Sequence, residues 1–402
     1  MRDVTVTHNG VRRICGAVLL AVLAVTIGSI FTKPGDPDRV IAAGAVQPSL
    51  PPPLDRVRQM LHKQAAALVR GDQAGWLAAV DPPLRGRYQD LYRTLRALRV
   101  TTVDYRVTAG KPPAVTVELS YCFTDCAGER PRIAQALTVR AVGDAYVISA
   151  LAPPGRPTDF QPAPWEAGDL VFAQGRRVTV AAPRALAGRL AEVVAVADRA
   201  AAVDDRYAAL AGNRQARYRI FLATDRLWRT WYGGKAAEWA VGYMQPLASA
   251  GGDVVIDPGR IRNRSGLLEV LQHEMGHVAT IGGATPDADD MWLVEGVAEY
   301  IAAQPRRAAD TYSRSQLRRP AAMAVRPLPD GAGPAEVAAF YAHGHFAVDC
   351  LAATFGEPRA MEFVRLRLRL GNSLDVAARS VFGRPYAEVD RACVARLRDQ
   401  AG

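Results

Sequence analysis

Two histidines four residues apart constrain this chain more than any other feature of its sequence. They lie in the stretch VLQHEMGHVA, which has apolar residues at both ends and contains no proline. This pattern predicts a helix over residues 266–280, with Ser265 or Asn263 as its N-cap. On such a helix His273 and His277 point the same way, so that both imidazoles can bind one ion.

The residue types around these histidines indicate a particular ion. Two imidazoles and one carboxylate suit Zn²⁺, with a water molecule in the open fourth position. Glu274 lies next to His273 in the sequence and cannot share the ligand geometry. We therefore expect Glu274 to act as a general base that takes a proton from the zinc-activated water. A third protein ligand is still needed.

A second helical segment offers that third ligand. Residues 292–300 read WLVEGVAEY and begin fifteen residues after His277. Glu295 and Glu299 lie one helical turn apart and so share a face of this helix. Gly296 in the helix interior costs about 1 kcal/mol relative to alanine. A close approach of another helix beside the metal would explain that glycine.

The two segments together resemble the gluzincin zinc peptidases, and WLVEGVAEY resembles the W-L-x-E-G-x-A form of their aminopeptidase branch. The resemblance implies a thermolysin-like catalytic domain in which Glu295 is the third ligand. By resemblance to the thermolysin branch, Glu299 should accept a hydrogen bond from His273 and orient that ring. The metzincin pattern is excluded, because it requires Gly and His where this chain has Thr280 and Gly283.

A third segment, FYAHGHF at residues 340–346, offers donors for the oxyanion that forms when water attacks a carbonyl group. Tyr341 to Gly344 resembles the Y-x-K-G segment of the aminopeptidase branch, where the tyrosine has this role. His343 stands where that family usually has lysine. The alternative donors are His343 and His345, by resemblance to the histidine of the thermolysin branch.

Residues 242–246, GYMQP, resemble the G-x-M-E-N segment that binds the free amine of the substrate in aminopeptidases. Gln245 stands in place of the glutamate and Pro246 in place of the asparagine. The resemblance therefore implies an endopeptidase rather than an aminopeptidase. We expect the strand at residues 253–256 to be the edge against which an extended peptide substrate pairs.

The N-terminus predicts a membrane anchor. Residues 14–31 contain no charged residue and are long enough to cross a bilayer as a helix. Arg12 and Arg13 precede them, which predicts that residues 1–13 stay in the cytoplasm and that the remainder is exported. The alternative is a cleaved signal peptide with a small-residue site at residues 43–45. An uncleaved anchor is favoured, because that site lies far beyond the apolar run.

Cysteine usage agrees with export. Four of the five cysteines lie outside the apolar run, and an even number in an exported chain indicates disulfides. Three pairings are possible. The most economical joins Cys122 to Cys126 and Cys350 to Cys393, the second pair stapling the C-terminal helices.

The remaining pattern predicts an α+β chain with two domains. Residues 54–151 carry two helical stretches followed by four alternating runs. This order resembles the cone-like fold of nuclear transport factor two, and it implies an accessory domain. Residues 166–402 carry short strands followed by helices, as a mixed sheet and a helical catalytic region require. Proline-rich segments at 32–53 and 152–165 are expected to be linkers.

The net charge of +10 does not indicate a nucleic-acid partner, because the positive residues are spread along the chain. The sequence therefore predicts a membrane-anchored zinc metallopeptidase that acts on a protein or peptide outside the cytoplasmic membrane. Two alternatives are a zinc-dependent binding or sensor protein without turnover, and zinc-dependent hydrolysis of something other than a peptide. The oligomeric state is not predicted.

Overall fold

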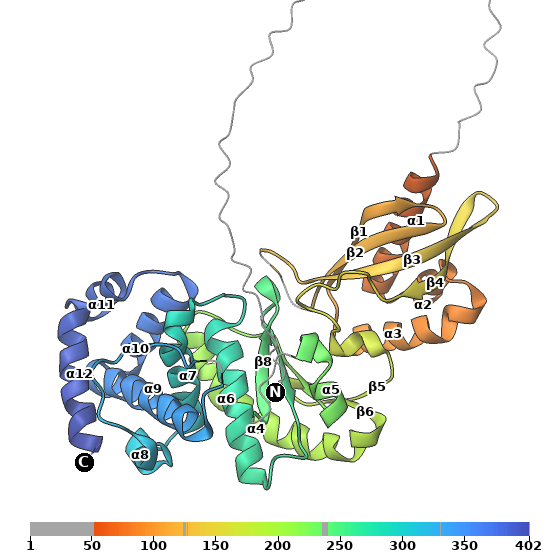
Figure 1. The fold of residues 1–402 in the computed structure, drawn as a ribbon. Coiled ribbons are helices and arrows are strands. Elements are labelled where there is room, and N and C mark those ends of the chain that lie inside the picture. The colour runs from red at the N-terminus through yellow and green to blue at the C-terminus, as the bar shows by residue number, and fades with distance from the viewer. Residues whose placement is uncertain (1–51, 124–125, 127, 235–239, 330, 402) are drawn as a thin grey trace, which may run out of the picture. The chain divides into compact units, whose positions relative to one another are not determined.

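The computed structural model describes residues 52–123, 126, 128–234, 240–329 and 331–401 (Figure 1). The expected cytoplasmic N-terminus, the expected membrane anchor and nearly all of the first expected linker lie outside these residues. Within the described part of the chain, no helix combines the length and the apolar character that a membrane span requires.

The first domain has three helices and a four-stranded antiparallel sheet in which neighbouring strands follow one another in sequence (Figure 1). Its elements are α1 (Pro53–Arg70), α2 (Gln73–Ala78), α3 (Arg85–Ala97), β1 (Thr102–Lys111), β2 (Ala114–Cys122), β3 (Arg132–Val142) and β4 (Ala145–Ala152). The predicted helices and the predicted strand meander are confirmed. Helix α2 was not expected, and Asp72 caps it by accepting from the backbone N–H of Gly75.

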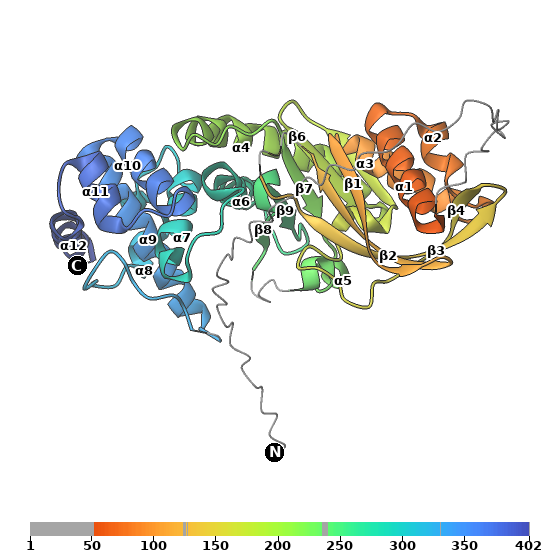
Figure 2. The same cartoon turned by 90° about the horizontal axis from the view of Figure 1, so that it is seen from above.

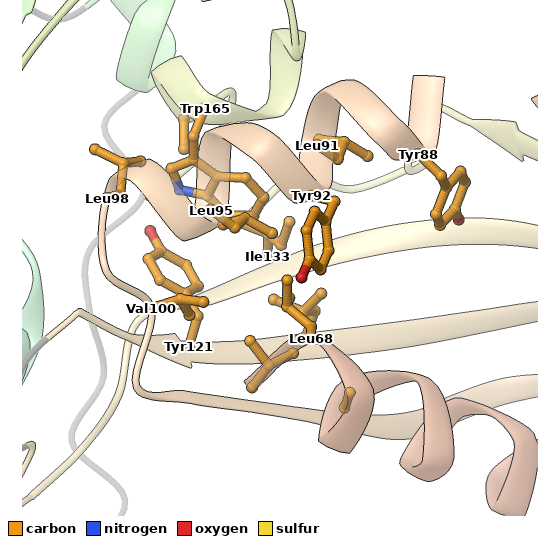
Figure 3. Close-up of a cluster of buried hydrophobic side chains, with 14 of the residues drawn as sticks. Leu68, Tyr88, Leu91, Tyr92, Leu95, Leu98, Val100, Tyr121, Ile133 and Trp165 are labelled. Carbon is orange, nitrogen blue, oxygen red and sulfur yellow. The ribbon is translucent and has the colours of Figure 1, made fainter. Parts of the chain in front are cut away.

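Aromatic side chains fill the interior of this domain (Figure 3). Tyr88, Tyr92 and Tyr121 are buried there together with Trp165, whose ring meets that of Tyr121 at a centroid distance of 5.0 Å. Trp165 belongs to the segment 152–165, which was expected to be a linker. Trp165 and Ala163 of that segment are buried in the core of the domain, where the tryptophan contributes a large apolar surface.

The second domain is built on a mixed five-stranded sheet. Its strands are β5 (Leu170–Gln174), β6 (Val178–Pro183), β7 (Tyr218–Leu222), β8 (Gly242–Pro246) and β9 (Gly252–Ile256). Their order in the sheet is β5-β6-β7-β9-β8, with parallel pairing among the three central strands and antiparallel pairing at both ends. The expectation that residues 253–256 form the edge is therefore wrong. The chain turns back after β8 and inserts β9 between β7 and β8, so that β8 is the edge strand.

Two helices, α4 (Leu190–Leu210) and α6 (Arg264–Ile281), pack together against this sheet (Figure 2). They bury a core of aliphatic side chains that includes Val180, Val193, Ile220 and Leu271. Asn263 caps α6, since its side chain accepts a hydrogen bond from the backbone N–H of Gly266. The short helix α5 (Asp225–Trp228) joins β7 to the segment before β8.

The rest of the described chain is helical. It contains α7 (Met291–Ala302), α8 (Ser313–Gln316), α9 (Pro334–Phe355), α10 (Glu357–Val364), a π-helical turn (Arg365–Arg369), α11 (Leu374–Phe382) and α12 (Tyr386–Ala401). Short 3-10 turns connect the elements at Pro82–Leu84, Pro164–Ala167, Arg184–Arg189, Trp231–Gly234, Ala248–Ala250, Ala288–Asp290 and Ala308–Asp310. One disulfide, Cys350–Cys393, joins α9 to α12, and the other, Cys122–Cys126, closes a short loop after β2. Both predicted disulfide pairings are confirmed.

Helices α7 and α9 meet through two glycines. A Cβ atom on Gly296 would collide with the backbone carbonyl of Gly344, and a Cβ atom on Gly344 would collide with the carbonyl of Trp292. The close approach expected from Gly296 is therefore confirmed. Gly276 in α6 differs, because a Cβ atom there would meet Ala298 and Ile301 at an ordinary 3.6 Å.

These contacts predict opposite effects for two similar substitutions. Gly296→Ala should lower the free energy of unfolding by about 3 kcal/mol, since two backbones would have to separate. Gly276→Ala should raise it by about 0.5 to 1 kcal/mol through helix propensity alone. Denaturant unfolding of the metal-free full-length protein measures both. Equal effects of the two substitutions would contradict the close contact of α7 with α9.

Candidate metal centre

Two helices bring three ligand atoms together. Helix α6 presents Nε2 of His273 and Nε2 of His277, which lie 3.1 Å apart. Helix α7 presents Oε2 of Glu295, which lies 3.2 Å from the first nitrogen and 3.4 Å from the second. These three side chains form a group that could hold a metal ion. The sequence predicted the same three ligands.

The hydrogen bonding of this group shows that a cation fits it. Nδ1 of His273 lies 3.1 Å from Oε1 of Glu299 and donates to it, which leaves Nε2 as the ring nitrogen that faces His277 and Glu295. Oε2 of Glu295 is buried and has no hydrogen-bond partner among the described residues. A bound cation would satisfy this oxygen together with the two neighbouring imidazole nitrogens.

The charges of the group compensate one another. Burial alone would lower the pKa of His273, but Glu295 and Glu299 outweigh it and raise that pKa well above its usual value. Burial opposes ionisation of Glu295 as well, yet the neighbouring His277 and His273 hold the pKa of Glu295 well below its usual range. Glu295 is therefore ionised, as a carboxylate ligand must be.

Glu299 occupies the position expected from the sequence, one turn after Glu295. Its Oε1 accepts from His273, and its Oε2 accepts a hydrogen bond of 3.0 Å from the hydroxyl of Tyr312. The sequence did not predict Tyr312, which lies just before α8 and belongs to no motif. The only signal for it would have been an aromatic residue shortly after the ligand helix, and such residues are common.

Glu274 lies beside the three ligands but is not one of them. Its side chain is buried, and burial raises the pKa of its carboxyl group. The carboxylate lies against the edge strand β8, since a Cβ atom on Gly242 would come within 2.9 Å of its Oε1. The absence of a side chain at this position therefore gives Glu274 the room that it occupies.

A cavity of about 1070 Å³ opens at the metal centre, between β8 and the helices α6, α7 and α9. Its lining includes the three predicted ligands, the predicted base Glu274, and Glu299, which was expected to orient His273. Tyr341 also lines it, and its ring stacks on that of His273 at a centroid distance of 5.8 Å. A cavity of this size has room for water together with either a small organic substrate or a peptide segment.

The two alternative donors differ in their positions. Nε2 of His343 lies 2.7 Å from the backbone carbonyl of Met323, and His343 is not among the residues that line the cavity. His345 does line it. Its Nδ1 lies 3.0 Å from the hydroxyl of Ser313, and its Nε2 has no partner among the described residues. The structure thus brings His345 to the site together with Tyr341, and not His343.

Strand β8 presents a different side chain to the cavity from the one expected. Gly242, Tyr243, Met244 and Pro246 line the cavity, whereas Gln245 does not, and its amide donates to the carbonyl of Pro246. The position expected to meet a substrate amine is therefore not part of the cavity lining.

Comparisons with known proteins do not assign the site. No model of a protein family matches this chain, and no curated protein matches it. The metal centre is therefore defined by the geometry of the chain itself.

The geometry predicts a stoichiometric metal ion. Purified full-length protein should retain about one zinc ion per chain, and His273→Ala should lose it, because two ligand atoms do not hold the ion. His62→Ala, which removes an exposed histidine of α1, is the matched control and should retain the ion. Inductively coupled plasma mass spectrometry measures the content. Equal metal in both variants would rule out this centre.

Proposed function

We propose that the protein is a zinc-dependent metallopeptidase of the gluzincin type, and that it acts as an endopeptidase outside the cytoplasmic membrane. The observation that carries this proposal is the position of Glu274. It is a buried carboxylate that is not a ligand, and it lies beside three converging ligand atoms at an open cavity. A site that only binds a metal has no need of such a base.

The ligand set favours zinc over harder cations. Two imidazoles and one carboxylate make up the protein ligands of several catalytic zinc sites, which keep one position open. Bound there, zinc would lower the pKa of a water molecule and polarise the carbonyl group of a substrate. His273, His277 and Glu295 would hold the ion, and Glu299 would fix the ring of His273.

Glu274 would supply the proton transfers. Its carboxylate would take one proton from the attacking water as the new C–O bond forms at the substrate carbonyl. It would then give that proton to the amine nitrogen as the C–N bond breaks. The wall formed by Gly242 and Val270 would keep the carboxylate in place during both transfers.

Tyr341 would stabilise the oxyanion that forms in between. Burial, together with the carboxylates of Glu295 and Glu274, raises the pKa of Tyr341 well above its usual value. The hydroxyl group therefore keeps its proton and is able to donate it in a hydrogen bond. His345 would be a second donor, because the residue lines the same cavity and its buried Nε2 has no partner among the described residues.

The carboxylates of the cavity lining also favour an endopeptidase, independently of the argument from Gln245. Its lining includes four carboxylates, and each already has a partner or a role. Glu269 forms an ion pair of 2.8 Å with Arg306, and the other three belong to the metal centre. No free carboxylate among the described lining residues awaits a substrate amine. The edge strand β8 offers its backbone to an extended peptide.

Other features support the wider proposal. Two disulfides agree with a location outside the cytoplasm. A mixed sheet followed by helices is the order expected of a thermolysin-like domain, and three helices on a curved antiparallel sheet suit a cone-like accessory domain. Zinc-dependent binding without turnover remains the alternative, and the buried Glu274 argues against it.

Removal of the proposed base tests the chemistry. Glu274→Gln should retain zinc and lose at least about a hundredfold of the cleavage rate, in keeping with the usual size of general-base catalysis. The measurement is cleavage of unstructured protein such as casein by the full-length protein. Zinc-loaded wild type that cleaves no peptide in a diverse mixture, and that does not differ from Glu274→Gln, would favour the binding alternative.

A second prediction concerns the space behind the base. Gly242→Ala should keep zinc but lower the cleavage rate about tenfold or more, since the new methyl group pushes the carboxylate away from its place. Gly266→Ala at the start of α6, where a Cβ atom would have only contacts beyond 3.5 Å, should leave the rate unchanged.

The length of the acid provides the decisive comparison for this pair. Asp is shorter than Glu by one methylene and leaves room for the methyl group. Gly242→Ala should therefore cost less in a Glu274→Asp background than in the wild type, measured as kcat at saturating substrate. Strictly additive losses would show that Gly242 does not act on Glu274.

A further inference from the structure

We propose that Tyr312 is a positioning residue of the metal centre, which acts on the ligand His273 through Glu299. The inference rests on the zinc centre of the proposed function and extends it by one residue, from a segment outside the three motifs. Among the described residues, no hydrogen bond or ion pair joins Tyr312 to a ligand atom or to Glu274, whereas its hydroxyl donates to Glu299. Its effect on the metal must therefore pass through Glu299.

The hydrogen bonds of Glu299 define the connection. Its two carboxylate oxygens have different partners, because Oε1 accepts from Nδ1 of His273 at 3.1 Å and Oε2 accepts from the Tyr312 hydroxyl at 3.0 Å. A carboxylate held at both oxygens cannot rotate about its last bond. With Oε2 released, the plane of the carboxylate would be set by one hydrogen bond only, and the His273 ring would lose its fixed orientation.

The segment that carries Tyr312 is itself fastened on both sides. Before it, Arg307 donates two hydrogen bonds to the buried carboxylate of Asp349 in α9, at 2.7 and 2.9 Å. After it, the hydroxyl of Ser313 lies 3.0 Å from Nδ1 of His345, one turn earlier in the same helix. Residues 307–313 are thus tied to α9 while Tyr312 reaches across to α7. This arrangement makes the Tyr312 hydroxyl a fixed point.

The ring of Tyr312 is also part of the cavity lining. The residue is 55% exposed, which is unusual for so large a side chain, and it lies in the same cavity as the three ligands. Its hydroxyl donates to Glu299, and the residue lines the cavity that a substrate would fill.

The test removes the hydroxyl group and measures zinc rather than cleavage. Tyr312→Phe in the full-length protein should weaken zinc binding about tenfold, at the low end of the range found when partners of metal ligands are removed. A chromophoric chelator that competes for zinc gives the dissociation constant. The matched control is Tyr300→Phe, which removes a hydrogen bond of 3.1 Å from α7 to Glu357, away from the metal. It should leave the dissociation constant unchanged.

A double-variant cycle separates positioning from packing. In a Glu299→Ala background, Tyr312→Phe should have no further effect on the zinc dissociation constant, because alanine makes neither hydrogen bond and the connection is already broken. An unchanged constant for Tyr312→Phe in the wild-type background overturns the proposal, and so does a tenfold loss that persists in Glu299→Ala. Either result is compatible with the zinc centre, provided that the wild type retains the ion and His273→Ala loses it. Wild-type protein without zinc would instead refute the proposed function.

Discussion

Helices α7 and α9 touch backbone to backbone at Gly296 and Gly344, and the arrangement of the site depends on that contact. Helix α7 carries Glu295 and Glu299, and α9 carries Tyr341 and His345 on turns next to the second glycine. Side chains at the crossing would separate the two helices and widen the distance between the candidate ligand Glu295 and the proposed oxyanion donor Tyr341. Each of the two glycines lowers helix stability by about 1 kcal/mol relative to alanine, and together they allow the two helices to approach closely at the site.

The second constraint is electrostatic. Three potential ligand atoms from α6 and α7 lie within 4.8 Å of one another, and the buried Oε2 of Glu295 has no hydrogen-bond partner among the described residues. Such an arrangement destabilises the metal-free protein, and the binding of a cation removes this destabilisation. Metal binding and the packing of α7 on α6 should thus be coupled. Glu299 and, as proposed, Tyr312 matter for the same reason, because they hold the His273 ring that presents one of these ligand atoms.

The sequence allowed the metal centre to be predicted because its features are local. Four-residue spacing on a helix placed His273 beside His277, and one further turn placed Glu299 on the face of Glu295. The elements whose position depends on distant pairing were not predictable in this way. Strand β8 proved to be the edge strand, because β9 lies between β7 and β8 in the sheet. That insertion leaves no local pattern in the sequence from which it could be predicted. His343 turns to a backbone carbonyl, and Tyr312 reaches the centre from a segment without periodicity.

The central claim is that two imidazoles and a carboxylate hold one zinc ion in this chain. X-ray absorption at the zinc edge of the purified full-length protein tests it most directly. The account predicts a shell of nitrogen and oxygen atoms at about 2.0 to 2.2 Å that includes two imidazoles, with no sulfur. His277→Ala should lose the ion and with it the zinc-edge signal. A sulfur shell at about 2.3 Å, or bound zinc in His277→Ala with the same imidazole contribution as in the wild type, would contradict it.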